Sequence, residues 1–164
     1  MDRLWSPWRM EYIETARDDG EDGTGVACVF CTLLQPGAGD NRVLIRTDAA
    51  FVALAKYPYN PGHLLVLPMR HVGDLAEITP DEGSEIQGLL QRCVAVLRDV
   101  AEPQGFNLGL NLGRVAGAGI PEHLHWHVVP RWGGDTNFMP VIGDTRVLPE
   151  LLDETYRKLA PHFA

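Results

Sequence analysis

Short apolar runs, each bounded by glycine or proline, recur along this chain. They are β-branched or alternate with polar residues, which is typical of strands in a half-buried sheet. The pattern predicts five strands, at residues 42–46, 51–55, 63–67, 106–112 and 123–129.

One strong helical pattern separates the third and fourth of these strands. Residues 79–82 (Thr-Pro-Asp-Glu) match a capping box, in which Thr79 accepts from the backbone amide of Glu82 and proline takes the first helical position. Pro103 and Gly105 end the helix. Between these ends, apolar residues follow a helical period and form one stripe: Ile86, Leu89, Leu90, Cys93, Val94, Leu97 and Val100.

A second helix is predicted near the end of the chain. It begins near Pro149, and Leu152, Tyr156, Leu159 and Phe163 share one side of it. Strands that lie next to one another, with helices on one face, predict a single α+β domain over residues 1–164. Residues 1–25 would form an N-terminal extension and residues 145–164 the C-terminal helix; Trp5 and Trp8 are expected to pack on the domain or on a partner subunit.

Composition narrows the class of function. The 164 residues carry a net charge of −8, which argues against a broad nucleic-acid-binding surface but not against a small phosphate substrate. The N-terminus lacks an apolar signal stretch and no run approaches membrane-spanning length, so we expect neither secretion nor a membrane partner. Three cysteines, of which two are close together, do not suggest a disulfide framework, and a reducing, cytoplasmic compartment is expected.

The most informative segment is the last predicted strand, where His123, His125 and His127 alternate with apolar residues. Strand side chains alternate between faces, so the three imidazoles are expected to line one surface while Leu124, Trp126 and Val128 enter the core. Burying three imidazoles without evident partners would cost desolvation energy, which favours this orientation. A single histidine here would be an ordinary polar surface residue, but three in alternation indicate a site.

The preceding strand ends in a glycine-rich loop at residues 113–119. If the two strands pair, this loop lies at the end of the histidine row, and its glycines would let backbone amides approach an anion. The amides of Gly117, Ala118 and Gly119 in this loop are therefore candidate phosphate ligands, although such a loop is more often a simple turn.

Cys28 and Cys31 form a second constellation, since two thiolates at this spacing together with two imidazoles complete a tetrahedral zinc site. His71 and His123 are the candidate partners. A pair of reduced cysteines or a redox pair remains the alternative, although a redox pair normally opens a helix in a βαβ context that is not evident here.

The segment His-Leu-His-Trp-His-Val-Val at 123–129 resembles the signature of the histidine-triad family. Pro61-Gly62-His63 is similar to the family's upstream histidine segment, and Asn111 with the glycine loop to its phosphate-binding turn. The resemblance runs from about Cys28 to Trp132. Residues 5–9, 59–63 and 130–135 resemble the bacterial branch of diadenosine polyphosphate phosphorylases and hydrolases.

The resemblance implies an antiparallel sheet of about five strands, paired across a homodimer. It implies that His125 attacks the α-phosphorus of a nucleotide conjugate, that His127 contacts the phosphate or leaving group, and that His63 supports the imidazole network. It also implies structural zinc at Cys28, Cys31, His71 and His123. Imidazole, with a pKa of ~6.5, is largely neutral at physiological pH and can attack without a separate strong base.

Two departures bear on specificity. Ala55 occupies the position where the family usually carries Asp or Asn for the ribose hydroxyls, and Lys56 is a candidate to compensate. Ala118 and Gly119 stand where relatives often have Gln or Ser, which slightly favours water over phosphate as the acceptor.

The leading hypothesis is therefore a nucleotidyl hydrolase or transferase acting on dinucleoside polyphosphates. The alternatives are a phosphorylase of diadenosine polyphosphates, a non-catalytic nucleotide-binding protein, and an enzyme whose histidine row holds a catalytic metal.

Overall fold

The computed structural model describes residues 28–35, 42–136 and 148–164. The predictions for the N-terminal extension, with Trp5 and Trp8, lie outside these residues.

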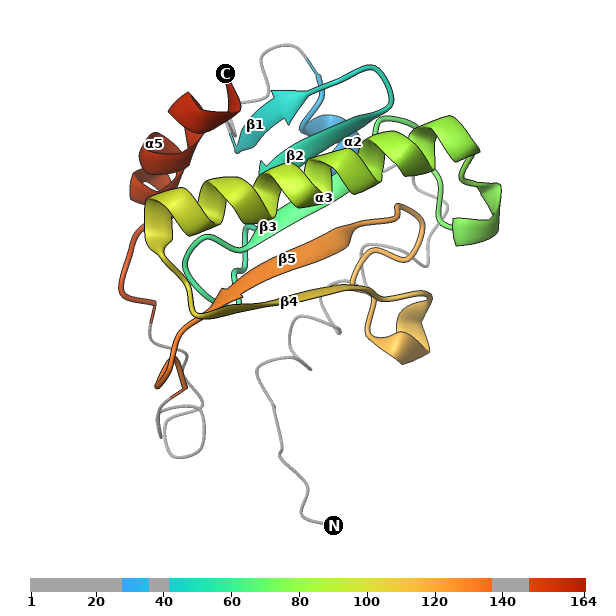
Figure 1. Ribbon diagram of the computed structural model, residues 1–164. Helices are drawn as coiled ribbons and strands as arrows, with labels where there is room; N and C mark the ends of the chain where they lie inside the picture. Colours follow the sequence, from blue (N-terminus) through green and yellow to red (C-terminus); the bar gives the residue numbers. More distant parts are fainter. Residues whose placement is uncertain (1–27, 36–41, 137–147) are drawn as a thin grey trace.

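The centre of the fold is one antiparallel sheet of five strands in the order β1-β2-β3-β5-β4. This confirms the predicted sheet, with strands shifted at their ends by one to three residues. Strand β5 therefore lies between β3 and β4 (Figure 1). The strands are β1 (Val43–Arg46), β2 (Ala50–Leu54), β3 (Leu64–Pro68), β4 (Gly105–Leu110) and β5 (Trp126–Arg131).

Two helices cover one face of the sheet, as predicted: α3 (Pro80–Ala101) and α5 (Leu152–Phe163). The capping box at Thr79 and Glu82 is present with both of its hydrogen bonds. Figure 1 shows α3 crossing the sheet, with α5 beside it over β1. The apolar stripe of α3 packs on alternate residues of β2, β3 and β5, among them Val52, Val66 and Val128.

The opposite face carries a smaller apolar cluster. Helix α2 (Val29–Thr32) is a single turn, and its Phe30 packs with Leu33 against Phe51, Ala53 and Leu65. These strand residues alternate with those that contact α3, so α2 lies on the other side of the sheet. The two long helices thus share one face, and a short helical turn that the sequence pattern did not predict covers part of the other.

Strand β5 begins at Trp126 and not at His123, which corrects the predicted strand 123–129. Residues before Trp126 leave the sheet: the backbone amide of Leu124 donates to Val72 O at 2.7 Å, so this segment follows the chain that leaves β3. Among the described residues, no helix is long and apolar enough to cross a membrane.

The start of α3 makes a testable electrostatic contribution to stability. Hydrogen bonds from the Arg70 guanidinium and from the Thr79 backbone lower the pKa of Glu82 from 4.5 to about 2. A carboxylate with a depressed folded-state pKa stabilises the fold above its unfolded pKa, and that contribution is lost as the pH falls toward 2.

We therefore expect Glu82→Gln to destabilise the protein by about 1 kcal/mol at pH 7, because Arg70 is partly exposed to water. The corresponding fall in Tm is roughly 2–4 °C. Thermal unfolding followed by circular dichroism should show the difference from wild type shrinking between pH 5 and pH 2. The exposed Glu154→Gln variant is the control, and a difference that persists at low pH would contradict the assignment.

Candidate active site

Three histidines of the site are buried rather than exposed on an open surface. His123 is fully buried and His125 is 7% exposed, while His63 is also buried. The predicted row of three surface imidazoles is therefore wrong, although Leu124 and Val128 are buried as expected. The physical reason is that each imidazole has hydrogen-bond partners, which offset the desolvation that made burial look costly.

The imidazole of His125 is held in one tautomer. Its Nδ1 lies 2.8 Å from the backbone carbonyl of His123, and a carbonyl only accepts, so Nδ1 carries the proton and donates. Nε2 then keeps its lone pair. Burial lowers the pKa of His125, so the ring stays neutral and Nε2 stays available as a nucleophile.

His63 and His127 form a second, oppositely arranged unit. The backbone amide of Tyr59 donates to His63 Nδ1 at 3.1 Å, so the proton of a neutral His63 lies on Nε2. His63 Nε2 in turn donates to His127 Nδ1 at 2.9 Å. A neutral His127 consequently carries its own proton on Nε2. The rings of His125 and His127 are 5.2 Å apart, which places a lone pair and an N–H donor in neighbouring rings.

A cavity of about 400 Å³ opens beside His127 on the sheet face opposite α3. Its lining includes Tyr59, Asn107, Gly109 and Arg131. Gly109 pairs with His127 across β4 and β5, so this part of the wall has no side chain to block the imidazole. A volume in this range suits a small-molecule ligand.

The glycine loop at residues 113–119 begins three residues beyond the end of β4, whose Leu110 pairs with Trp126. Asn111 Nδ2 donates to Gly117 O at 3.3 Å and so braces the loop. The amides of Gly117 and Ala118 donate to Arg114 O and Gly113 O, which means that the loop itself uses two of the amides predicted to bind phosphate. The Ala118 side chain is buried. Gly117 has a φ of 91°, which favours glycine.

Ala55 and Lys56, the two residues predicted near a ribose, lie in different environments. Ala55 is buried, and its amide donates to His63 O at 3.0 Å, so it helps to hold the His63 segment against β2. Lys56 is exposed, and its ammonium lies over the Tyr57 ring at 5.6 Å from the centroid.

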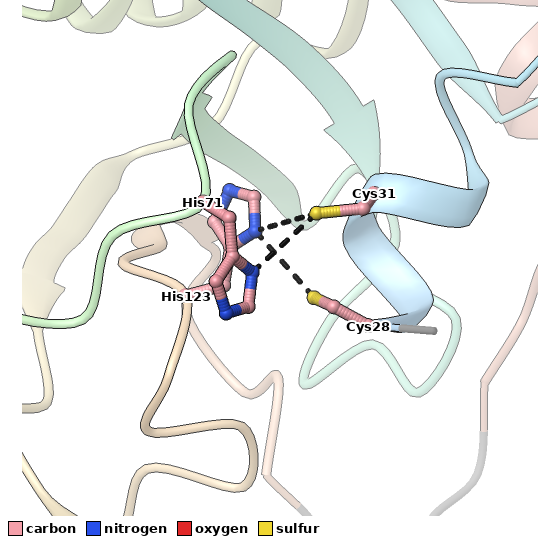
Figure 2. Close-up of side chains that lie close together, drawn as sticks. All are labelled: Cys28, Cys31, His71 and His123. Atoms are coloured by element: carbon pink, nitrogen blue, oxygen red, sulfur yellow. Dashed lines mark hydrogen bonds between the residues drawn. The ribbon is translucent and has the colours of Figure 1, made fainter. Parts of the chain in front are cut away.

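The structure brings together all four residues of the predicted metal site (Figure 2). The Sγ of Cys28 lies 3.5 Å from His123 Nδ1, and the Sγ of Cys31 lies 3.4 Å from His71 Nδ1 and 3.6 Å from His123 Nδ1. Tetrahedral zinc, with Zn–S of about 2.3 Å and Zn–N of about 2.0 Å, separates such ligand atoms by roughly 3.5 Å. The four donors therefore fit one such ion.

The backbone carbonyl of Pro68 orients the ring of His123. His123 Nε2 donates to this carbonyl at 3.0 Å, which leaves the Nδ1 lone pair toward the two thiols. Partners of this kind commonly fix the tautomer of a metal-binding histidine. Burial and the neighbouring Cys28 raise the pKa of Cys31 to about 11, so without a cation this thiol stays protonated. The four side chains are thus placed so that they could hold a metal ion.

The structure adds residues to which the sequence assigned no role. The ring of Phe30 lies 5.1 Å from that of His125 and 5.5 Å from that of His123, between the two groups of histidines. Tyr59 stacks on His63, and Asn60 bonds to Asp135. Phe30 lies between the two cysteines of the predicted metal site. Tyr59, Asn60 and Asp135 lie in segments 59–63 and 130–135, which resemble the bacterial branch of the family, so the resemblance of these segments could have pointed to them.

Comparison with known families assigns the chain to a class. Residues 37–134 match the HIT domain, the histidine-triad family, and the chain belongs to that family.

Particular relatives narrow the class further. The chain is 43% identical to a protein named AP-4-A phosphorylase from Mycobacterium tuberculosis, over all of this chain and 85% of that protein. It is 36% identical, over 58% of its own length and 52% of the other, to a Schizosaccharomyces pombe bis(5'-nucleosyl)-tetraphosphatase. Among solved structures, a zinc-bound histidine triad family protein from Mycobacterium smegmatis matches with a TM-score of 0.66 and 26% identity, over 84% of this chain and 93% of that one.

Proposed function

We propose that this protein cleaves dinucleoside polyphosphates at the α-phosphorus through a covalent nucleotidyl intermediate on His125. The observation that carries the proposal is the pair of fixed, opposite tautomers in neighbouring rings: a lone pair at His125 Nε2 and an N–H at His127 Nε2. The names of the M. tuberculosis and S. pombe relatives support this substrate class.

In the first step, the lone pair of His125 Nε2 forms a bond to the α-phosphorus. The bond from phosphorus to the bridging oxygen breaks, and its electron pair stays on the leaving polyphosphate. His127 Nε2–H donates a hydrogen bond to that oxygen as charge develops on it, and His63 holds His127 in the required tautomer. An acceptor then attacks phosphorus, and the bond to His125 breaks. Asn111 and residues 117–119 are the proposed ligands of the phosphoryl oxygens, and the Gly117 and Ala118 amides would have to share or exchange their bonds to Arg114 O and Gly113 O. Lys56 is a further candidate.

The proposed cofactor is one structural zinc ion held by Cys28, Cys31, His71 and His123, as the geometry of the cluster and the zinc-bound relative support. When bound, zinc would keep both sulfurs as thiolates and tie α2 to the segment before β5. Phe30, which touches both His123 and His125, would thereby be fixed against the nucleophile. The ion supplies no reacting group in this mechanism.

We further propose a cytoplasmic homodimer that binds neither nucleic acid nor membrane. The support for the dimer lies at the sheet edge formed by β4, where Leu108 is 49% exposed and Leu112 just beyond is 46% exposed. A second copy of the chain would cover these apolar side chains and extend the sheet. Cys28, Cys31 and Cys93 are free of disulfides, which agrees with a reducing compartment.

The first test concerns the nucleophile. His125→Ala should fold with an unchanged circular dichroism spectrum and lose turnover of diadenosine tetraphosphate by at least about 10³-fold, because no covalent intermediate can form. Mass spectrometry of acid-sensitive adducts should detect a nucleotidyl group on wild type and none on the variant. Near-native kcat in His125→Ala would sink the proposal.

Removal of the metal is the second test. Purified protein should contain one zinc per chain by elemental analysis, and chelation should lower Tm because metal binding is coupled to folding of the α2 segment. Cys31→Ser should lower both zinc content and Tm, whereas Cys93→Ser, in the core and away from the cluster, should retain the zinc. Zinc-free protein with both thiols of the pair freely titratable would contradict the site.

The acceptor is the third test. The sequence slightly favoured water as the acceptor, because Ala118 and Gly119 lack donor side chains. The structure weakens that reason, because the side chain of Ala118 is buried. The name of the 43% identical relative favours phosphate. We expect diadenosine tetraphosphate to give ADP in step with added phosphate. Formation of AMP that is unaffected by phosphate would instead establish hydrolysis.

A further inference from the structure

Asp135 accepts hydrogen bonds from three other residues at the end of β5. Its carboxylate accepts from the Nε and a terminal nitrogen of Arg131 at 2.5 and 2.9 Å, from the backbone amide of Trp132 at 3.2 Å and from the side chain of Asn60 at 2.8 Å. The Arg131 guanidinium holds the pKa of this carboxyl well below its usual range. Asp135 is therefore charged, and its side chain is only 10% exposed, so these donors are what keep it in place.

Asn60 is the partner that connects this carboxylate to another part of the chain. Its buried amide donates one hydrogen to Asp135 Oδ2 and the other to Pro130 O at 2.9 Å. Both hydrogens of the side-chain amide are thus bonded to acceptors at the end of β5, Pro130 and Asp135, which lie 70 and 75 residues further along the sequence. The turn at residues 59–63 is fixed to that strand end by these two bonds.

This turn sets the orientation of His63. The Asn60 carbonyl accepts from the His63 backbone amide at 3.1 Å, and the amide of the preceding Tyr59 donates to His63 Nδ1. The Tyr59 ring stacks on the same imidazole, with centroids 5.0 Å apart. If Asn60 moved, the hydrogen bond from the Tyr59 amide to His63 Nδ1 would be lost, and His63 could then exchange between its two tautomers.

We propose that Asp135, acting through Asn60, is a positioning residue that locks the direction of the hydrogen bond from His63 to His127. The lock makes His127 Nε2 a permanent donor to the oxygen that leaves phosphorus, and so it rests on the proposed function. Strand pairing alone, between Leu65 and His127, sets the distance between the two segments but not which nitrogen carries the proton. Asp135 is not among the residues that line the cavity, so its effect on catalysis must pass through other groups.

The experiment compares two AMP aryl esters, the 4-nitrophenyl and the phenyl ester. A donor to the leaving oxygen matters more when that oxygen is more basic, as in the phenyl ester. Asp135→Asn should lower kcat about tenfold for the phenyl ester and by no more than about twofold for the nitrophenyl ester, with KM nearly unchanged. Imidazole ¹⁵N spectra should show His63 protonated on Nε2 in wild type and averaged between tautomers in the variant.

Two further variants make the result decisive. Asn60→Ala breaks the same connection while leaving the pair of Arg131 and Asp135 in place, and it should reproduce the dependence on leaving group if Asp135→Asn folds poorly. Glu82→Gln makes the matched carboxylate-to-amide change in another arginine pair, at the start of α3 and outside the cavity lining, and should lower both rates equally or not at all. Equal losses on the two esters, or an unchanged His63 tautomer in both variants, would overturn the proposal. A wild-type protein inactive on both esters, with the expected His63 spectrum, would instead count against the proposed function.

Discussion

The hydrogen bond between the imidazole of His125 and the backbone carbonyl of His123 joins the two chemical centres of this protein. The side chain of His123 faces the thiols, and its backbone oxygen sets the tautomer of the candidate nucleophile two residues later. Any change that rotates this peptide would alter the candidate metal site and the proposed nucleophile together. The carbonyl of Pro68 restrains the His123 ring from the other side, so the end of β3 takes part in holding both centres.

The sheet order makes this connection effective. Because β5 lies between β3 and β4, its His127 faces residues from both sides: His63 just before β3, and Gly109 on β4. Alternation along the strands sends Val128 toward α3 and His127 toward the open face. One face of the sheet thus carries most of the apolar packing, while the other combines a smaller apolar cluster around Phe30 with the polar site. The sheet thus separates the main hydrophobic core from the candidate active site.

The sequence was sufficient where local rules decide the structure. The capping box at Thr79 and Glu82, the stripe along α3 and the alternation of the strands are local patterns, and all appear in the fold. The spacing of Cys28 and Cys31 located half of the cluster, and two candidate histidines completed it. Local patterns failed for the burial of His123 and His125, because the partners that make burial favourable are mostly backbone carbonyls, which the sequence does not mark. They also gave no sign that Asn60 would meet Asp135 across 75 residues.

Backbone groups determine which nitrogen of each imidazole carries the proton. A carbonyl can only accept and a backbone amide can only donate, so the carbonyl at His123 and the amide at Tyr59 are enough to give neutral His125 and His63 defined tautomers. A carboxylate in place of the His123 carbonyl would also have fixed the proton on Nδ1 of His125, but it would have favoured the imidazolium and removed the lone pair that the proposed attack on phosphorus needs. Burial lowers the pKa of His125 and so keeps the proposed nucleophile uncharged, while the His123 carbonyl fixes which nitrogen carries the proton. The charged group, Asp135, is held at a distance, where it stabilises the turn and not the cationic form of a histidine.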